Sequence, residues 1–229
     1  GRGTADHTNI KGQLDSWLPL QMATTPWGLA SSDVKYFDIN NDSINDFSAG
    51  RISVVTDEEG VAYINKVKNY ESLAFDKSWM RRVVLTADNP DSAGDFHTDV
   101  ANIAAQVTRL GFDSEAYYHP ANDVRAVLTD SSSWESSVVG YTGHGLTTRV
   151  DQFLKTSDVA SLTNSKGQAL FLPLTCSAGN SNYPGHKSLS ETLVFPDQAE
   201  LDSSGLFLKG AIASVAPTGK SLNVDAGVL

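Results

Sequence analysis

Short apolar runs that end at polar or glycine-rich turns constrain the fold of this chain more than any other feature. Residues 137–139 (Ser-Val-Val) lead into a glycine-rich turn, and residues 169–174 (Ala-Leu-Phe-Leu-Pro-Leu) lead to the only cysteine, Cys176. Apolar runs bounded by Gly, Ser and Asn are typical of buried strands in a parallel sheet. The sequence therefore predicts that both runs are neighbouring core strands.

Helical patterns alternate with strand patterns from Arg81 onwards. Residues 97–110 have apolar side chains at helical spacing, and Gly111 follows as a stop signal. We expect strands at 83–86, 114–118, 137–141, 169–174 and 209–215, and helices at 97–110, 122–129, 157–164 and 188–195. This alternation predicts an α/β fold with a mostly parallel sheet that is covered on both faces.

The N-terminal third has weaker periodicity. We expect loops and short extended pieces in residues 1–35, a strand at 51–55, a helix from 57 or 58 to about 71, and a linker at 72–80. These patterns predict a partial N-terminal subdomain at 1–75, with an Asp-rich loop, and a catalytic subdomain at 79–229. Because the first residues resemble the middle of a protein, we expect a fragment or a processed form with further domains.

Composition excludes several classes of protein. The formal net charge of −10 and the absence of a basic cluster argue against a nucleic-acid partner. No apolar run approaches the ~18 residues of a membrane span. A single cysteine rules out an internal disulfide framework.

The two strand ends carry residues that suit nucleophilic catalysis. His144 stands in the stretch Gly-Tyr-Thr-Gly-His-Gly of residues 140–145, and Cys176 follows the second apolar run. Strand ends are where α/β folds collect their chemistry. An imidazole beside a thiol supports thiolate formation and can later protonate a leaving amine. A buried cysteine is more often inert, and a histidine between glycines often marks a tight turn, but the preceding strands favour catalysis.

An Asp/Asn ladder in the N-terminal part suggests a cation site. Its oxygen ligands would come from Asp38, Asn40 and Asp42, the backbone carbonyl of Ile44, and Asp46, an alternation that suits Ca²⁺. The glycine and the final glutamate of an EF-hand are missing, which excludes that motif. The alternative is an Asx-rich turn that satisfies its own backbone.

Four segments, in order, resemble the gingipain family of cysteine peptidases in the caspase-like clan, over about residues 31–216. The first segment runs from Asp33 to the Gly-Arg pair at 50–51. The others are Leu-Thr-Ala-Asp at 85–88, Tyr-Thr-Gly-His-Gly at 141–145, and Leu-Thr-Cys at 174–176 with its downstream helix and strand. Their order and spacing make the resemblance specific. It implies a caspase-like three-layer sandwich and peptide-bond hydrolysis.

The resemblance also implies a role for each matching residue. Cys176 is the nucleophile, His144 is the general acid and base, and Asp88 orients the histidine. The N–H groups of Gly145 and Cys176 form the oxyanion hole. Asp95 recognises an Arg or Lys side chain at P1, the substrate residue before the scissile bond. From the residues alone, Asp88 could instead brace a loop, and Asp95 could cap the following helix.

The resemblance also implies a substrate class and a location. By resemblance, the substrate is a protein or peptide, the location is outside the cell or at its surface, and the chemistry requires no cofactor. Two alternatives stay open. One is a relative with a different P1 preference, and the other is a non-catalytic gingipain-like module of a secreted surface or secretion-system protein.

Overall fold

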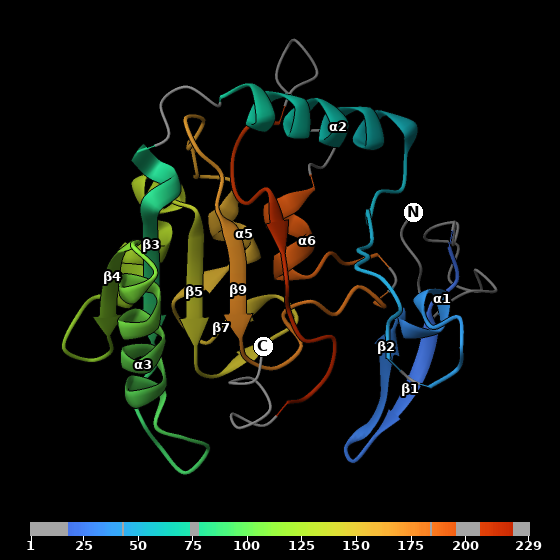
Figure 1. Cartoon of the computed structure of the whole chain (residues 1–229), viewed down its shortest axis with the longest axis horizontal. Helices are drawn as coiled ribbons and strands as arrows, with labels where there is room; N and C mark the ends of the chain where they lie inside the picture. The colour runs from blue at the N-terminus through green and yellow to red at the C-terminus, as the bar shows by residue number, and fades with distance from the viewer. Residues whose placement is uncertain (1–17, 43, 74–77, 184, 196–206, 222–229) are drawn as a thin grey trace.

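A five-stranded parallel sheet forms the centre of the molecule in the computed structural model (Figure 1). The structure describes residues 18–42, 44–73, 78–183, 185–195 and 207–221. The strands lie in the order β10-β9-β5-β3-β4, and every neighbouring pair is parallel. Their bounds are β3 (Arg82–Ala87), β4 (Asp113–Tyr118), β5 (Val138–Thr142), β9 (Leu170–Leu174) and β10 (Ala213–Ser214).

Helices cover both faces of this sheet. The alternation of side chains along β5 sends Val138 to one face and Val139 and Tyr141 to the other. Helix α3 (Phe96–Arg109) packs on the first face. Helices α4 (Val124–Thr129), α5 (Thr156–Val159) and α6 (Leu189–Val194) pack on the second. This arrangement confirms the predicted α/β three-layer sandwich with its mostly parallel sheet.

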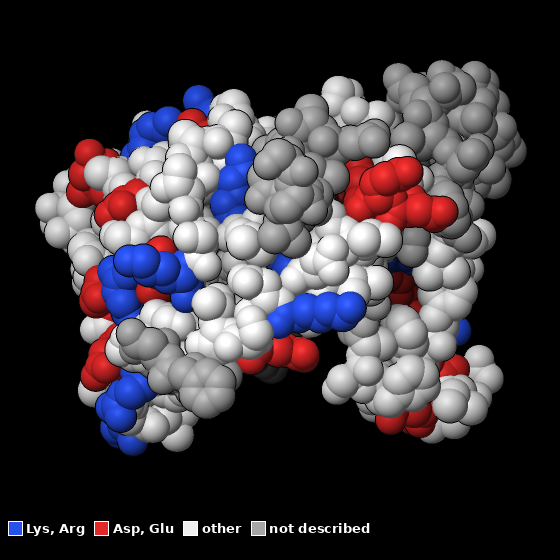
Figure 2. Space-filling view, turned by 90° about the horizontal axis from the view of Figure 1, so that it is seen from above, with Lys and Arg blue, Asp and Glu red and all other residues white. Residues whose placement is uncertain are grey.

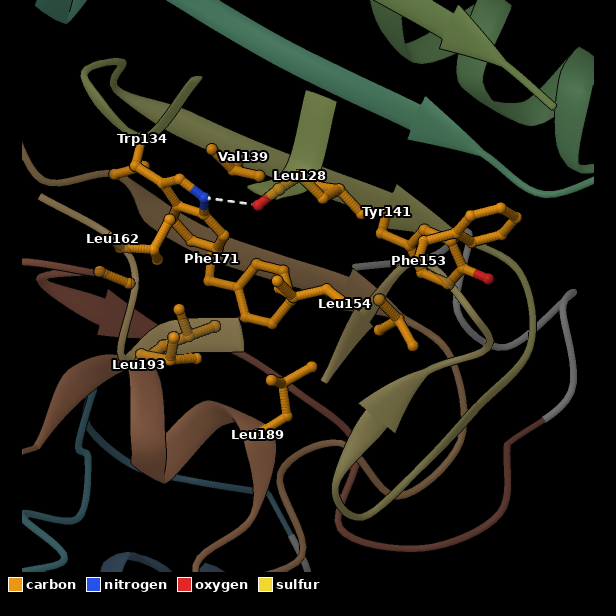
Figure 3. Close-up of a cluster of buried hydrophobic side chains, with 14 of the residues drawn as sticks. Leu128, Trp134, Val139, Tyr141, Phe153, Leu154, Leu162, Phe171, Leu189 and Leu193 are labelled. Atoms are coloured by element: carbon orange, nitrogen blue, oxygen red, sulfur yellow. Dashed lines mark hydrogen bonds between the residues drawn. The ribbon is translucent and has the colours of Figure 1, made fainter. Parts of the chain in front are cut away.

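The larger part of the core lies on the second face (Figure 3). Trp134 is fully buried there, and its indole N–H donates to the carbonyl of Leu128 at 3.0 Å. Trp134 is the last residue of the short 3-10 helix at Ser131–Trp134. A small antiparallel sheet closes the end of this layer, formed by β6 (Gly145–Leu146), β7 (Arg149–Val150) and β8 (Leu154–Lys155). Periodicity did not indicate these two-residue strands.

The N-terminal elements lie beside the sheet. A hairpin of β1 (Gln21–Thr25) and β2 (Gly28–Ser32) precedes α1 (Val34–Phe37), and α2 (Asp57–Ser72) runs along the top of the view in Figure 1. The predicted linker contains residues 74–77, which lie outside the described residues, and a 3-10 turn at Ser78–Arg81. The proposed division near residue 75 stays a prediction.

A buried lysine attaches α2 to the sheet. Lys66 has no exposed surface. Its Nζ donates to the carbonyl oxygens of Ala211 at 2.7 Å, Lys209 at 2.9 Å and Val194 at 3.1 Å. These carbonyls belong to the end of α6 and the segment that leads into β10, so one side chain joins three parts of the chain.

Three element predictions need correction. Residues 51–55 are not a strand. The N–H of Val55 donates to the Glu59 carboxylate at 2.8 Å and not to a neighbouring strand, and the Arg51 side chain pairs with Asp33 at 2.6 Å. The helix predicted at 157–164 is a single turn, α5, and the N–H of Thr163 just beyond it donates to Ser131 Oγ. The strand predicted at 209–215 is observed only as β10, which has two residues.

The surface agrees with the charge analysis. Figure 2 shows one face of the molecule, on which Lys and Arg stand in small groups beside Asp and Glu and form no continuous basic area in the described part. Among the described residues, no helix has both the length and the apolar character needed to cross a membrane.

Candidate active site

The ends of β5 and β9 bring the predicted histidine and cysteine to one edge of the sheet. The two strands are parallel neighbours with Thr142 opposite Leu174. The N–H of Gly143 continues the pairing by donating to the carbonyl of Leu174 at 3.3 Å. His144 and Cys176 each follow the Thr142–Leu174 pair by the same number of residues. Sequence and register together therefore place them at the carboxyl ends of adjacent strands.

His144 has a carboxylate partner that the sequence did not identify. Its Nε2 lies 2.8 Å from Oδ2 of Asp91, and the ring also meets the edge of Phe96 with centroids 5.5 Å apart. The imidazole is 50% exposed, so the loop holds it without enclosing it. Asp91 is fixed in a tight turn with Gly94, and its Oδ1 accepts the N–H of Ala93 at 2.7 Å.

The pKa of Asp91 is lowered, first by the hydrogen bond from the Ala93 N–H and then by His144. Both partners favour the ionised carboxylate. An anionic acceptor on Nε2 also fixes the orientation of the ring. The only sequence signal for Asp91 was its membership of the acidic loop between Asp88 and Asp95.

The hydrogen bonds of Asp88 go to neighbours of the imidazole, and its predicted role in orienting His144 stays a prediction. Asp88 is buried, and its carboxylate accepts the N–H of Asn89 at 2.8 Å and the hydroxyl of Tyr141 at 3.3 Å. Its own N–H donates to the carbonyl of Thr142 at 2.9 Å. Asp88 follows β3 directly, and these bonds hold its side chain beneath the His144 loop, whereas the ring reaches outward to Asp91.

The N–H of Gly145 is not used in the ladder between β6 and β7. The N–H of Asp151 donates to the carbonyl of His144 at 3.0 Å, and Gly145 is the next residue, opposite Val150. Because bonded and non-bonded pairs alternate in an antiparallel ladder, the Gly145 N–H points away from β7. A side chain at this position would clash, since a Cβ would lie 2.5 Å from Thr175 Oγ1. The oxyanion-hole roles of the Gly145 and Cys176 N–H groups both stay predictions.

Cys176 stands in a loop that the C-terminal part of the described chain holds in place. Its thiol is partly exposed and donates to the carbonyl of Ser221 at 3.6 Å. Ser177, the next residue, has a φ of 57° in the left-handed region, and its N–H donates to Gly219 at 2.8 Å. Unusual backbone conformations of non-glycine residues often occur at functional sites because surrounding bonds impose them.

Thr175 is an unexpected feature of the same loop. Its Oγ1 is buried and has no hydrogen-bond partner among the described residues. The side chain lies against Gly145, so it touches the histidine loop and the cysteine loop together. The sequence included Thr175 in the Leu-Thr-Cys motif but gave it no role of its own.

Asp95 acts locally as a helix cap. Its carboxylate accepts the N–H of Thr98 at 3.1 Å and the hydroxyl of Thr98 at 2.7 Å, so it closes the N-terminus of α3. These bonds lower its pKa, the hydroxyl bond most. The capping alternative raised from the sequence is therefore the geometry observed. The P1 role of Asp95 stays a prediction.

The Asp-rich loop satisfies its own backbone. The N–H of Ile39 donates to Asp46 at 2.6 Å, and the N–H of Asp42 donates to Asn40 at 2.9 Å and Asp38 at 3.0 Å. The N–H of Ile44 donates to Asp42 at 2.9 Å. Within the described ranges, no group of three or more His, Cys, Asp or Glu side chains gathers in a way that could hold a metal ion. The calcium site stays a prediction.

Comparisons with known proteins identify the family of the chain and support its fold. The family described as "Peptidase family C25" matches residues 1–227. The crystal structure of the Arg-specific cysteine proteinase gingipain R (RgpB) is similar at a TM-score of 0.69 and 22% identity, over 87% of this chain and 46% of that one. The complex of Porphyromonas gingivalis RgpB pro- and mature domains is similar at a TM-score of 0.69 and 22% sequence identity. This similarity covers 86% of this chain and 47% of that one. No curated protein matches. The chain thus spans about half the length of the solved structures it resembles.

Proposed function

The chain belongs to peptidase family C25, and from this membership we propose that it hydrolyses peptide bonds as a cysteine peptidase. One observation carries the proposal: His144 and Cys176 follow paired positions at the ends of the adjacent strands β5 and β9. A thiol and an imidazole on one sheet edge are the minimum set for an acyl-enzyme mechanism.

The proposed reaction begins with proton transfer from the Cys176 thiol to His144. Because Nε2 is bonded to Asp91, Nδ1 is the nitrogen left to accept that proton. The thiolate then attacks the peptide carbonyl carbon, and a C–S bond forms while the carbonyl oxygen becomes an oxyanion. The N–H groups of Gly145 and Cys176 stabilise that charge.

Collapse of this intermediate breaks the C–N bond. The imidazolium of His144 gives its proton to the leaving amine, and a thioester on Cys176 remains. Water then loses a proton to His144 and attacks the thioester carbon. The second tetrahedral intermediate releases the carboxylic acid, and the thiol of Cys176 regains its proton.

The finer part of the proposal is cleavage after Arg or Lys. It is supported by the acidic loop of residues 88–95 and by the similarity in fold to a proteinase that is itself described as Arg-specific. Asp95 is the candidate carboxylate, since an exposed cap retains lone pairs that a guanidinium can use. Profiling with a peptide library tests this point. A preference for acidic or apolar P1 residues would rule it out.

Substitution of the nucleophile tests the proposed activity. Cys176→Ala should remove all peptide hydrolysis while the melting temperature stays close to that of the wild type, because the side chain is partly exposed and only the sulfur is lost. Ser181→Ala, in the loop that follows, is the matched control and should retain activity. Equal turnover by the wild type and Cys176→Ala would refute the proposal.

The second candidate function is a non-catalytic gingipain-like module. It predicts a Cys176 thiol that alkylates no faster than a free cysteine near neutral pH. The partial exposure of Cys176 and the anionic partner of His144 favour the enzyme instead. For either function we propose a location outside the cell or at its surface, on the family resemblance alone.

A further inference from the structure

Tyr141 lies beneath the His144 loop, and its hydroxyl reaches two parts of the site. The side chain is fully buried, and its ring packs beside Phe153 with centroids 6.0 Å apart (Figure 3). The hydroxyl oxygen lies 2.9 Å from the main-chain carbonyl oxygen of His144 and 3.3 Å from Oδ2 of Asp88. One phenol therefore joins the backbone of the histidine to the buried acid.

The backbone between these residues is fitted closely to the same hydroxyl. A Cβ at Gly143 would lie 2.6 Å from the Tyr141 oxygen and would overlap the Cβ of Asp88. The loop from β5 to His144 thus rests on Tyr141 and Asp88 with no room for a side chain at residue 143. Any movement of the Tyr141 hydroxyl would be transmitted to this loop, because packed groups move together.

The phenol is able to donate a hydrogen bond. Burial raises the pKa of Tyr141 far above its ordinary value, and the negative charges of Asp88 and Asp151 raise it further. The hydroxyl therefore keeps its single proton, which has two acceptors within reach. The Asp88 carboxylate and the His144 carbonyl compete for that proton, so a change at Asp88 alters the bond to the histidine backbone.

We propose that Tyr141 is a positioning residue that couples the buried Asp88 to the main chain of His144. The two acids then have different roles. Asp91 orients the imidazole ring, and Asp88 acts through Tyr141 on the main chain of His144. This inference rests on the proposed peptidase function, because it concerns how the general base of that reaction is held.

The first test removes the hydroxyl and keeps the ring. Tyr141→Phe should lower kcat by roughly 10- to 100-fold with little change in KM, because a small displacement of a catalytic group slows the chemical step. Tyr63→Phe is the matched control. Tyr63 lies in α2, and its hydroxyl also donates to a main-chain carbonyl, that of Ile212, at 3.2 Å. The control should leave kcat unchanged.

The second test asks whether Asp88 acts through the phenol. Asp88→Asn is made in the wild type and in the Tyr141→Phe background. If the coupling is real, Asp88→Asn lowers kcat in the wild type but causes little further loss when the hydroxyl is already absent. Additive losses in the double variant would overturn the proposal.

A readout without turnover separates this inference from the proposed function. The rate of Cys176 alkylation by iodoacetamide is followed against pH, and Tyr141→Phe should shift its midpoint upward, because a displaced His144 supports the thiolate less well. A wild type that cleaves no peptide would refute the peptidase, while the alkylation midpoint would still decide the coupling. If Tyr141→Phe does not fold, Asp88→Asn is read in the same assay. An unchanged midpoint overturns the coupling in either variant.

Discussion

Two buried threonine hydroxyls near the sheet edge differ in whether they are bonded. Thr86 Oγ1 donates to the carbonyl of Gly140 at 2.9 Å, whereas Thr175 Oγ1 has no partner among the described residues. A buried hydroxyl without a partner costs about 1–3 kcal/mol, and one that is bonded contributes about 1 kcal/mol. The two sites therefore predict opposite effects for the same substitution.

Thr175→Val should raise the free energy of unfolding by about 1 kcal/mol, because the isosteric methyl group has no hydrogen-bonding requirement. Thr86→Val is the matched control and should lower it by about 1 kcal/mol. Urea unfolding with a shared m-value measures both. A loss of stability at Thr175 as large as that at Thr86 would show that its hydroxyl has an acceptor after all.

Individual site residues could be predicted from the sequence only where a strand precedes them. His144 and Cys176 follow apolar runs, so their positions at the ends of strands could be predicted. Asp91 was not, because its contact with the imidazole depends on a tight turn that returns the chain toward a residue far along the sequence. Asp88 was assigned to the ring by resemblance, and only the buried phenol of Tyr141 explains where its carboxylate points.

At the scale of elements, helix α3 depends on its cap. Asp95 accepts from Thr98, and these bonds hold its pKa below the ordinary value. A depressed pKa means that the stabilisation is present above the pKa of the unfolded chain and is lost as the pH falls through the lower folded value.

The cap therefore has a pH signature. Asp95→Ala should lower the melting temperature at pH 7. The difference from the wild type should begin to shrink below about pH 4, the ordinary pKa of an aspartate, and should vanish once the pH has fallen through the lower folded pKa. Asp95→Asn is the control, because asparagine caps about as well without a charge. A deficit of Asp95→Ala that persists unchanged in acid would mean that the ionised carboxylate does not stabilise α3.

Long elements were predictable and short ones were not. Periodicity located α2, α3 and the central strands within a few residues. In α3 the periodic apolar residues face the core, whereas in α2 Val61 and Ile64 are exposed. Strands β6 to β8 have two residues each, too few for a period to appear. The segment at 51–55 has the composition of a strand, but the N–H of Val55 donates to the Glu59 side chain, and the Arg51 side chain bonds Asp33.

At the scale of the molecule, Lys66 connects helix α2 to the central parallel sheet. Its ammonium group donates to the carbonyls of Val194, Lys209 and Ala211. Lys66→Met should lower the free energy of unfolding by about 3 kcal/mol, because several buried carbonyls lose their donor. Lys68→Met, on the exposed side of the same helix, should change it by less than about 0.5 kcal/mol. If the two variants changed the free energy of unfolding equally, the Lys66 bonds between α2 and the sheet would not contribute to stability.

The most direct test of the whole account is covalent capture of the nucleophile. A peptidyl chloromethyl ketone with arginine at P1 is incubated with the wild type and with His144→Ala, and intact mass and peptide mapping follow the label. The account predicts one equivalent on Cys176 in the wild type. The labelling rate should fall by about 10²-fold or more in His144→Ala, because that is the usual size of acid–base assistance. Labelling at equal rates in the two proteins, or at a residue other than Cys176, would contradict it.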